Sequence, residues 1–516
     1  MRITRKSTAF TAVFMVAATL GAKVCGMLRD VLIAAMYGTQ TAEAIAFSSA
    51  SRIPVLFFDI AFGSAVTSAF IPVFNEYLSN RGKDSALNLA NKFINLVLAM
   101  TLVLSVLGIV FSSQLVSIIA GGYEESILKL ISSLVIILFP MIIFTGLAFC
   151  VVGILQSFGQ FLVPAIISLV SNGFLILYLA IIGNGFGVKG VAFAMLIAWS
   201  LQLLVQIPSL CKVGYRFKPD FNFKDEGICK ISRLALPIIL SSWVQPINNL
   251  INIRLASSLA EQGSVAALDY ANRLYIILVS VFAYAITNLI FPSLSRANSE
   301  GDKKLFASIV SSGIRYALVV VVPIMTGFLI LSRPIIQLIY ERGQFDAHST
   351  TLTASALFFY SLGMVGYALQ EISNRAFYAM QDGKTPMVIS VCGISLNILL
   401  SIILLKAFEL DHRALAFSAS AAANLMGIAA LVVASKRNRG IISRDFVIGV
   451  VKIAASAVVM TIVVKAIDLF LADEQPVIRI AVCAFVGAII YFVCTLALGV
   501  KEVRDIINKV LKKKVA

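Results

Sequence analysis

Charged residues are scarce in this sequence, and their scarcity excludes most soluble folds. Only 13% of the 516 residues are charged, whereas a typical soluble protein carries about 25%. Hydrophobic residues make up 59%, and the mean hydropathy is +0.94. The apolar runs reach about 20 residues or more, which suits helices that cross a bilayer and is too long for barrel strands. We therefore predict an all-α polytopic membrane protein.

Residues that build most catalytic and metal sites are also few. The two histidines, His348 and His412, lie in or beside predicted loops, which makes a catalytic triad or a histidine metal site improbable. The seven cysteines form no CxxC pair or metal spacing, and we interpret them as small core residues. There is no Walker A motif for ATP. We expect no enzyme activity, no cofactor and no metal; energy would come from the membrane potential, an ion gradient or consumption of a product.

Fourteen apolar segments are long enough to be transmembrane helices. The first has a basic flank but no cleavage-site pattern, so we expect a retained span and not a removed signal. The segment 334–342 and the basic tail 502–514 are expected at the membrane interface, the tail as an amphipathic helix. The expected spans are 9–37, 42–77, 86–118, 125–156, 161–184, 188–211, 232–258, 264–295, 305–332, 348–380, 386–407, 413–435, 446–470 and 476–500.

Lysine and arginine gather in alternate connections between these segments. Roughly 25 fall in one set of connections and about five in the other, and the richer set is expected on the cytoplasmic side. This bias predicts that both termini are cytoplasmic. It also explains most of the formal net charge of +16, so nucleic acid is not an expected partner.

Two landmarks recur in the same order in the two halves of the chain. They are Arg52 to Pro72 with Arg273 to Pro292, and Asn172 to Ala192 with Asn397 to Ala416. The repeat predicts two six-helix lobes related by a pseudo-twofold axis along the membrane normal. We expect an N-lobe at 1–212, a cytoplasmic linker at 213–231, a C-lobe at 232–436, and two further helices with the basic tail at 437–516.

The stretch Leu20–Gly38 carries three charges in the middle of an apolar segment: Lys23, Arg29 and Asp30. A charge at bilayer depth costs roughly 2.5–3.5 kcal/mol even on the lenient insertion scale, so these groups must face protein or a water-filled cavity. The repeat adds Arg52 and Arg273 at equivalent positions of the two halves. Several cations in one membrane cavity suit an anionic substrate, and the arginine fork matches phosphate or pyrophosphate oxygens.

Local ion pairing is the alternative interpretation of these charges. Arg29 could pair with Asp30 or Asp59, although Asp30, as its neighbour, is displaced by about 100° around a helix. Arg273 could pair with Asp269, and Arg375 with Glu371. We predict that Arg29, Arg273, Arg52 and Lys23 bind substrate. We keep Asp30, Asp59, Glu371 and Arg375 as candidate cavity or gating residues, with local pairing favoured for the last three.

Six motifs together resemble one transporter family. They are K-V-C-G-M-L-R-D at 23–30, R-I-P at 52–54, A-F-I-P at 69–72, Y-A-N-R-L at 270–274, E-R-G-Q-F-D at 341–346 and F-Y-A-M-Q-D-G-K-T-P at 377–386. In these the chain resembles the MurJ (MviN) lipid II flippases of the MOP superfamily. The resemblance implies fourteen helices, with two lobes in a V around a cationic cavity and the last two helices bordering a hydrophobic groove.

The resemblance also implies a substrate and a location. The substrate is lipid II, an undecaprenyl-pyrophosphate-linked disaccharide pentapeptide moved from the inner to the outer leaflet of the bacterial cytoplasmic membrane by alternating access. Membrane lipids and the cell-wall synthesis machinery are implied partners. The essential cavity arginines carry over to Arg29 and Arg273. Lys23 stands where many members have arginine, Asn272 replaces an acid, and Phe58 lies near a basic position of the family.

Three other functions stay open from the sequence. The first is a flippase for another undecaprenyl-linked saccharide. The second is a MATE-like, ion-coupled multidrug exporter, although an exporter of cationic drugs would need acidic residues in its cavity where this chain offers arginines. The third is a membrane scaffold that transports nothing, in which the intramembrane charges would serve assembly.

Overall fold

Every regular element in the described residues is helical, which confirms the predicted all-α class. The computed structural model describes residues 5–62, 66–408, 410–505 and 507–508. By its internal contacts the chain forms two compact units, Met1–Ala266 with Arg342–Gln344, and Ala267–Glu341 with Phe345–Ala516. Ten helices within the described ranges, or eleven if the bent pair α16–α17 is one span, are long and apolar enough to cross a membrane. Much of the expected surface helix 502–514 lies outside these ranges.

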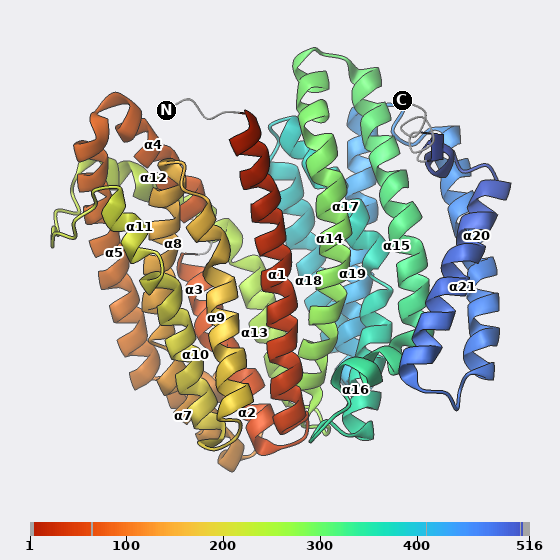
Figure 1. Ribbon diagram of the computed structural model, residues 1–516, viewed down its shortest axis with the longest axis horizontal. Helices are drawn as coiled ribbons and strands as arrows, with labels where there is room; N and C mark the ends of the chain where they lie inside the picture. Colours follow the sequence, from red (N-terminus) through yellow and green to blue (C-terminus); the bar gives the residue numbers. More distant parts are fainter. Residues whose placement is uncertain (1–4, 63–65, 409, 506, 509–516) are drawn as a thin grey trace. The chain divides into compact units, whose positions relative to one another are not determined.

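The first unit holds α1 to α13, and α1 packs along α9, which in turn packs on α10 (Figure 1). Its elements are α1 (Arg5–Tyr37), α2 (Ala42–Ala50), α3 (Arg52–Ala61), the π-helix η1 (Val66–Phe70), α4 (Ile71–Asn80), α5 (Gly82–Val110), α6 (Ser112–Ala120), α7 (Glu125–Leu138), α8 (Met141–Ser157), α9 (Leu162–Ile181), α10 (Gly187–Leu204), α11 (Ile207–Lys212), α12 (Glu226–Ser242) and α13 (Val244–Ser257).

Prolines mark where several of these helices begin. Pro54 and Pro246 are the third residues of α3 and α13, and Pro386 is the third residue of α18 in the second unit. Proline is tolerated in the first turn because the backbone N–H that it lacks has no helical partner there. The predicted span 42–77 is accordingly broken into α2, α3, η1 and α4.

Ion pairs at the start of α12 explain why the first unit extends past the predicted lobe boundary at 212. Asp225, which caps α12, accepts from Lys92 Nζ of α5 at 2.6 Å. Two further pairs lie beside it, Arg81–Glu226 at 2.9 Å and Lys230–Glu76 at 2.6 Å. These contacts attach α12 to α4 and α5. The lobe boundaries drawn from the repeat stay a prediction.

The second unit holds α14 to α21, and the hairpin of α20 and α21 packs against α15 (Figure 1). The segment 334–342, expected at an interface, is largely the continuation of α15 beyond a kink at Leu331 (φ −103°, ψ 16°). The helices are α14 (Ser264–Ser299), α15 (Lys303–Tyr340), α16 (Ala347–Ser361), α17 (Met364–Ala379), α18 (Lys384–Lys406), α19 (His412–Arg437), α20 (Arg444–Phe470) and α21 (Pro476–Ala497). Each of the fourteen expected segments thus overlaps a helix or a group of helices.

The 45° bend between α16 and α17 leaves backbone groups without helical partners. Side chains of α19 satisfy them. The Ser420 hydroxyl lies 2.6 Å from the Phe359 carbonyl oxygen, and Asn424 Nδ2 donates to the Leu362 carbonyl at 2.9 Å. Asn424 Oδ1 also accepts from the Gly366 N–H at 2.9 Å. A broken span needs such partners because unpaired backbone groups are costly in lipid.

Gly366 permits this close approach of α17 to α19, and its substitution should destabilise the protein. A Cβ at Gly366 would lie 2.4 Å from backbone atoms of Asn424, which cannot move aside cheaply. We expect Gly366→Ala to lower the free energy of unfolding by about 1–3 kcal/mol, the usual cost of overpacking. Gly327→Ala is the control, because a Cβ there meets nothing within 4 Å. Thermal unfolding of the purified protein in detergent compares them; equal midpoints for both variants would refute the packing argument.

Candidate functional site

Arg29 lies in α1 and is held by two neighbours. Its Nε and Nη2 atoms donate to Asp30 Oδ1 at 3.0 and 2.8 Å, and Nη1 donates to Asn172 Oδ1 of α9 at 2.9 Å. Local pairing with Asp30, kept as the alternative interpretation, is thus present in spite of the displacement of about 100° around the helix. The long, flexible arginine side chain reaches its neighbour even though the two Cβ atoms diverge.

Arg29 keeps unused donors in this arrangement. A guanidinium has five N–H groups, and the three hydrogen bonds to Asp30 and Asn172 are the only ones it makes within the described residues. The side chain is 12% exposed. One N–H on Nη1 and one on Nη2 are left for a further acceptor. An anionic group at this place could accept from both without displacing Asp30 or Asn172.

Two other arginines of the second unit pair along their own helices. Arg273 in α14 donates to Asp269 at 3.3 and 3.4 Å, and its side chain is 37% exposed. Arg375 in α17 donates to Glu371 at 3.2 and 3.3 Å. Both are i,i+4 pairs, the spacing at which side chains meet on one face of a helix. The sequence identified both partners correctly as the alternative interpretation.

The remaining candidates occupy less informative positions. Lys23 is half-buried in α1, one helix turn and a half before Arg29. Arg52 is the half-buried first residue of α3, where the second predicted span is broken. Asp59 is half-buried near the end of α3. The roles of these residues stay predictions. A joint site of Arg29 and Arg273 also stays a prediction, because the two arginines belong to different units. Nor do the described residues contain a cluster of three metal-ligating side chains.

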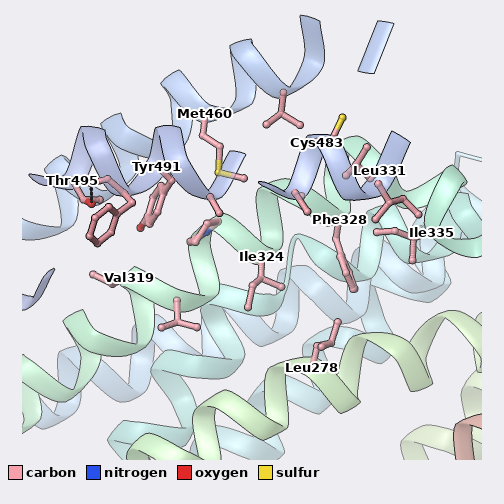
Figure 2. Close-up of a pocket in the computed structure, with 18 of the residues that line it drawn as sticks. Leu278, Val319, Ile324, Phe328, Leu331, Ile335, Met460, Cys483, Tyr491 and Thr495 are labelled. Carbon is pink, nitrogen blue, oxygen red and sulfur yellow. Dashed lines mark hydrogen bonds between the residues drawn. The ribbon is translucent and has the colours of Figure 1, made fainter. Parts of the chain in front are cut away.

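An apolar groove of about 650 Å³ runs along the second unit between α15 and the α20–α21 hairpin. Figure 2 shows Ile324 and Phe328 of α15 on one side and Met460, Cys483 and Tyr491 on the other. Leu278 of α14 lies at its floor. The volume is within the range of small-molecule sites, roughly 300–1,000 Å³. A lining this apolar suits a hydrocarbon chain and offers little to a charged ligand.

The motif at 341–346 makes a helix cap and a close loop contact. Asp346 accepts from the Ser349 N–H at 2.8 Å at the start of α16, and this hydrogen bond lowers the pKa of Asp346. The Gln344 N–H donates to the Ala35 carbonyl of α1 at 2.8 Å. Gly343 beside it has φ +59°, and a Cβ there would lie 2.2 Å from the Ala35 oxygen. Only glycine fits this position, because φ is positive and because a side chain would collide with the Ala35 oxygen.

The motif at 377–386 also caps a helix. Asp382 Oδ1 accepts from the backbone N–H groups of Lys384 and Thr385, at 3.0 and 3.1 Å, where α18 begins. Its Oδ2 accepts from the Thr385 hydroxyl at 2.6 Å and from Arg437 at the end of α19. The Thr385 and Arg437 hydrogen bonds outweigh a smaller opposing effect of burial and lower the pKa of Asp382 to about 2. The motif therefore joins three helices.

A comparison with protein families decides the relationship that these motifs indicate. The model of the family described as "Lipid II flippase MurJ" matches residues 33–502, which is most of the chain. The chain belongs to the MurJ family. A probable lipid II flippase MurJ of Buchnera aphidicola subsp. Schizaphis graminum (strain Sg) is 30% identical to it over 408 residues, 78% of this chain and 79% of the relative.

Solved structures share the fold of this MurJ-family chain. A lipid II flippase MurJ in an inward closed conformation aligns with a TM-score of 0.81 at 22% identity, over 96% of this chain and all of the other. An inward-facing multidrug resistance MATE transporter of the MOP superfamily aligns at 0.68 and 16% identity, over 83% of this chain and 98% of the other. The MurJ family sits in the bacterial inner membrane, and this chain is a multi-pass membrane protein. Because the members of the family are flippases, the chain is a transporter and not an enzyme.

Sequence reasoning missed Asn172 as a partner of Arg29. It marked Asn172 as a landmark of the repeat, but the two residues are 143 positions apart, and no spacing rule connects them. It also missed Arg315–Glu502 and Asp468–Arg479, two pairs with a buried acid. Asp468 lies near the end of α20 and Arg479 near the start of α21. Two residues of opposite charge on either side of a short turn could have predicted this pair.

Removing the Asp382 carboxylate should destabilise the α17–α19 junction. Asp382→Ala loses the cap and the Arg437 contact, and we expect it to lower the free energy of unfolding by about 1–2 kcal/mol. Asp382→Asn keeps an acceptor for the backbone and should lose less. Because the folded pKa lies below its ordinary value, the carboxylate's contribution is complete above about pH 4 and is lost only as the pH falls towards 2.

Unfolding at neutral pH therefore measures the full effect, and the difference between the variants and the unaltered protein should not change between mildly acidic and mildly basic buffer. Asp473→Ala, at an exposed loop position, is the control and should unfold like the unaltered protein. If Asp382→Ala is as stable as this control, the capping role is refuted.

Proposed function

We propose that this protein is a lipid II flippase. It carries undecaprenyl-pyrophosphate-linked MurNAc-pentapeptide-GlcNAc from the inner to the outer leaflet of the bacterial inner membrane for peptidoglycan synthesis. Membership of the MurJ family supports the substrate. The cell-wall synthesis machinery consumes lipid II outside, and this consumption is one candidate source of direction beside the membrane potential and an ion gradient.

The observation that carries the proposal is the arrangement of Arg29. A buried arginine with two N–H groups unused among the described residues is a ready donor for phosphate oxygens. Asp30 lowers the cost of keeping the guanidinium at membrane depth while no substrate is bound, because an unpaired buried charge is far less favourable than a paired one. The pyrophosphate then occupies the donors that Asp30 leaves.

Arg273 is the proposed second pyrophosphate ligand. Its hydrogen bonds to Asp269 are long, at 3.3 and 3.4 Å, and more than a third of the side chain is exposed. The length of these hydrogen bonds and the exposure of the side chain support Arg273 as a donor to phosphate. Lys23 and Arg52 are proposed as further contacts. Lys23 keeps the charge but, as a point charge on a flexible stem, lacks the fork of arginine.

The proposed architecture has fourteen transmembrane helices. Two six-helix lobes form a V with a pseudo-twofold axis along the membrane normal, both termini are cytoplasmic, and the cationic site opens to each leaflet in turn. The overlap of each expected segment with helices of the structure supports this count. Asp30, Asp59, Glu371 and Arg375 are proposed gating residues, because changing ion pairs would accompany any relative movement of helices.

The apolar groove is the proposed site of the undecaprenyl tail. The pyrophosphate and the tail need opposite environments, and the structure offers an apolar lining on α15, α20 and α21 and paired arginines on α1 and α14. The tail would stay in contact with the membrane while the head group crosses. This arrangement leaves only the polar head to be enclosed during transport.

Pairing of the acids argues against a drug exporter. Asp30, Asp269 and Glu371 each accept from an arginine, so they are poor sites for a cationic drug. A flippase for another undecaprenyl-linked saccharide shares the pyrophosphate and the tail, and differs only in the sugars. Family membership favours lipid II over that substrate.

The central test is growth of a bacterium depleted of its own lipid II flippase. We expect the unaltered chain to restore growth and Arg29→Ala or Arg273→Ala to fail at equal expression, because each removes donors for the pyrophosphate. Arg413→Ala is the matched control: Arg413 is exposed and paired with Asp411 at 2.7 Å, and its loss should not matter.

Three results would count against this assignment. Growth with both arginine variants would exclude them from the site. Failure of the well-expressed unaltered chain would favour the other saccharide flippase. Drug efflux by the unaltered chain, without restored growth, would favour the exporter.

Filling the groove should impair transport of the long-tailed substrate. Ala488→Phe places a ring in the groove, and displacing two methylene groups of the tail costs roughly 1.6 kcal/mol, or about 15-fold in affinity. Ala481→Phe makes the same change at an exposed position of the same helix outside the groove lining and serves as the control. Binding of lipid II is compared with binding of a short-chain analogue. An equal effect of Ala488→Phe on both ligands would argue against tail binding in the groove.

A further inference from the structure

A polar pocket of about 240 Å³ lies in the second unit, where the start of α15 meets the α19–α20 connection and the start of α20. Three cations line it, Lys304, Arg315 and Arg439, together with four serines and one acid. It shares no lining residue with the apolar groove or with the proposed pyrophosphate site. The connections at this end of the unit are rich in lysine and arginine, so the predicted topology places the pocket on the cytoplasmic side.

Arg315 is the least exposed of the three cations, with 13% of its side chain accessible. Its Nε donates to Glu502 just beyond α21, Nη1 donates to Ser311 Oγ at 2.9 Å, and Nη2 to Ser312 Oγ at 3.4 Å. A Cβ at Gly449 would lie 2.9 Å from Arg315 Cδ, so α20 packs against the stem of this arginine. Of five N–H groups, one on Nη1 and one on Nη2 have no acceptor among the described residues.

The serine hydroxyls of the pocket also keep donors. Ser311 and Ser312 accept from Arg315, and Ser443 Oγ accepts from the Phe446 N–H at 3.2 Å as the cap of α20. Each hydroxyl has one proton to donate, and within the described ranges none of these three donates to a protein acceptor. Three hydroxyl protons are therefore left for a ligand.

The α19–α20 connection brings the remaining donors to this place. Gly440 has φ +110°, a conformation that glycine adopts without strain, and it lies next to Arg439. The start of α20 adds the partial positive charge of a helix N-terminus. The acid of the lining, Asp445, is paired with Lys501 at 2.7 Å, so its charge is compensated from outside the pocket.

We propose that this pocket binds a phosphate group, presented either by the headgroup of an anionic lipid or by soluble phosphate. A phosphate accepts hydrogen bonds on several oxygens at once, and the pocket offers guanidinium, ammonium and hydroxyl donors from three parts of the chain. Three cations face one acid that already has a partner, which disfavours a positively charged ligand. A bound phosphate would connect α15 to the α19–α20 connection.

Exposed apolar side chains around the pocket support the lipid headgroup as the source. Leu305 beside Lys304, and Ile442 and Val447 on either side of Ser443, are 40–49% exposed. They offer acyl chains a surface next to the polar pocket. A basic pocket between transmembrane helices on the cytoplasmic side is a recurrent kind of site for an anionic headgroup.

Binding of phosphatidylglycerol to the purified full chain in a neutral detergent tests the proposal, with zwitterionic phosphatidylcholine as the reference lipid. Native mass spectrometry counts the bound lipid. We expect saturable binding of phosphatidylglycerol that Arg439→Gln weakens by about tenfold, the typical cost of one hydrogen bond to a charged group. Lys436→Gln is the matched control, because it removes one exposed charge of the same region outside the lining. It should bind like the unaltered chain.

A second pair of variants tests the sign of the pocket's charge. Ser308 is an exposed member of the lining, so a longer side chain fits there without disturbing the core. Ser308→Glu should weaken phosphatidylglycerol binding by at least tenfold, because it adds a carboxylate where the phosphate binds. Ser308→Gln has the same size without the charge and should bind more tightly than Ser308→Glu.

Inorganic phosphate is the probe that separates the two sources. Weaker binding of phosphatidylglycerol by Arg439→Gln, but not by Lys436→Gln, identifies a lipid headgroup. If phosphatidylglycerol binds no better than phosphatidylcholine, but inorganic phosphate raises the unfolding midpoint of the unaltered chain and not of Arg439→Gln, the source is soluble phosphate. Either result supports the phosphate site.

Two results would overturn the proposal. Equal losses in Arg439→Gln and Lys436→Gln would show that the lipid responds only to the general charge of the surface. A chain that neither prefers phosphatidylglycerol nor responds to inorganic phosphate has no phosphate site here. Unfolding midpoints without ligand check that each variant is folded, and the Ser308 pair decides if Arg439→Gln is not.

This inference stands apart from the proposed function. The pocket uses none of the residues proposed to bind lipid II, so restored or failed growth in the complementation test does not decide it. Loss of phosphatidylglycerol binding in the pocket variants would likewise leave the flippase assignment unchanged.

Discussion

Charge within apolar helices is the constraint on which the rest of this structure depends. Three arginines of apolar helices are met by an acid of the same helix: Arg29 by Asp30, Arg273 by Asp269, and Arg375 by Glu371. Such pairing removes most of the cost of an isolated buried charge. For Arg29 the pairing leaves two N–H groups unused among the described residues, and the proposed role in phosphate binding depends on these two groups.

The backbone obeys the same constraint where helices break. Ser420 and Asn424 satisfy the bend between α16 and α17, and Asp382 and Asp346 cap α18 and α16. Two of the longest family motifs therefore have structural tasks. The candidate substrate contacts lie in other motifs, those of α1, α3 and α14. The motif that identifies the family most clearly is thus not one that holds a candidate substrate contact.

Local rules explain which expectations succeeded. Apolar runs gave the helices, because each buries its own backbone polar groups without help from other segments. The i,i+4 pairs of Arg273 and Arg375 followed from helix periodicity. Periodicity is less informative for Arg29 and Asp30, because it describes the directions of Cβ atoms and not the reach of a long side chain. The extension of the first compact unit to Ala266 depends on contacts between distant segments, among them the ion pairs of α12 with α4 and α5.

The sequence by itself determined the all-α membrane class, the positions of the helices and the family, and it supplied the arginines that are proposed to bind a pyrophosphate. Each of these depends on composition, periodicity or short spacings. Only the tertiary structure decided that Asn172 holds Arg29, that α12 and α13 pack with the first unit, and that α15, α20 and α21 line an apolar groove. These contacts join residues far apart in the chain, and such pairs are selected by helix packing, which no local pattern encodes.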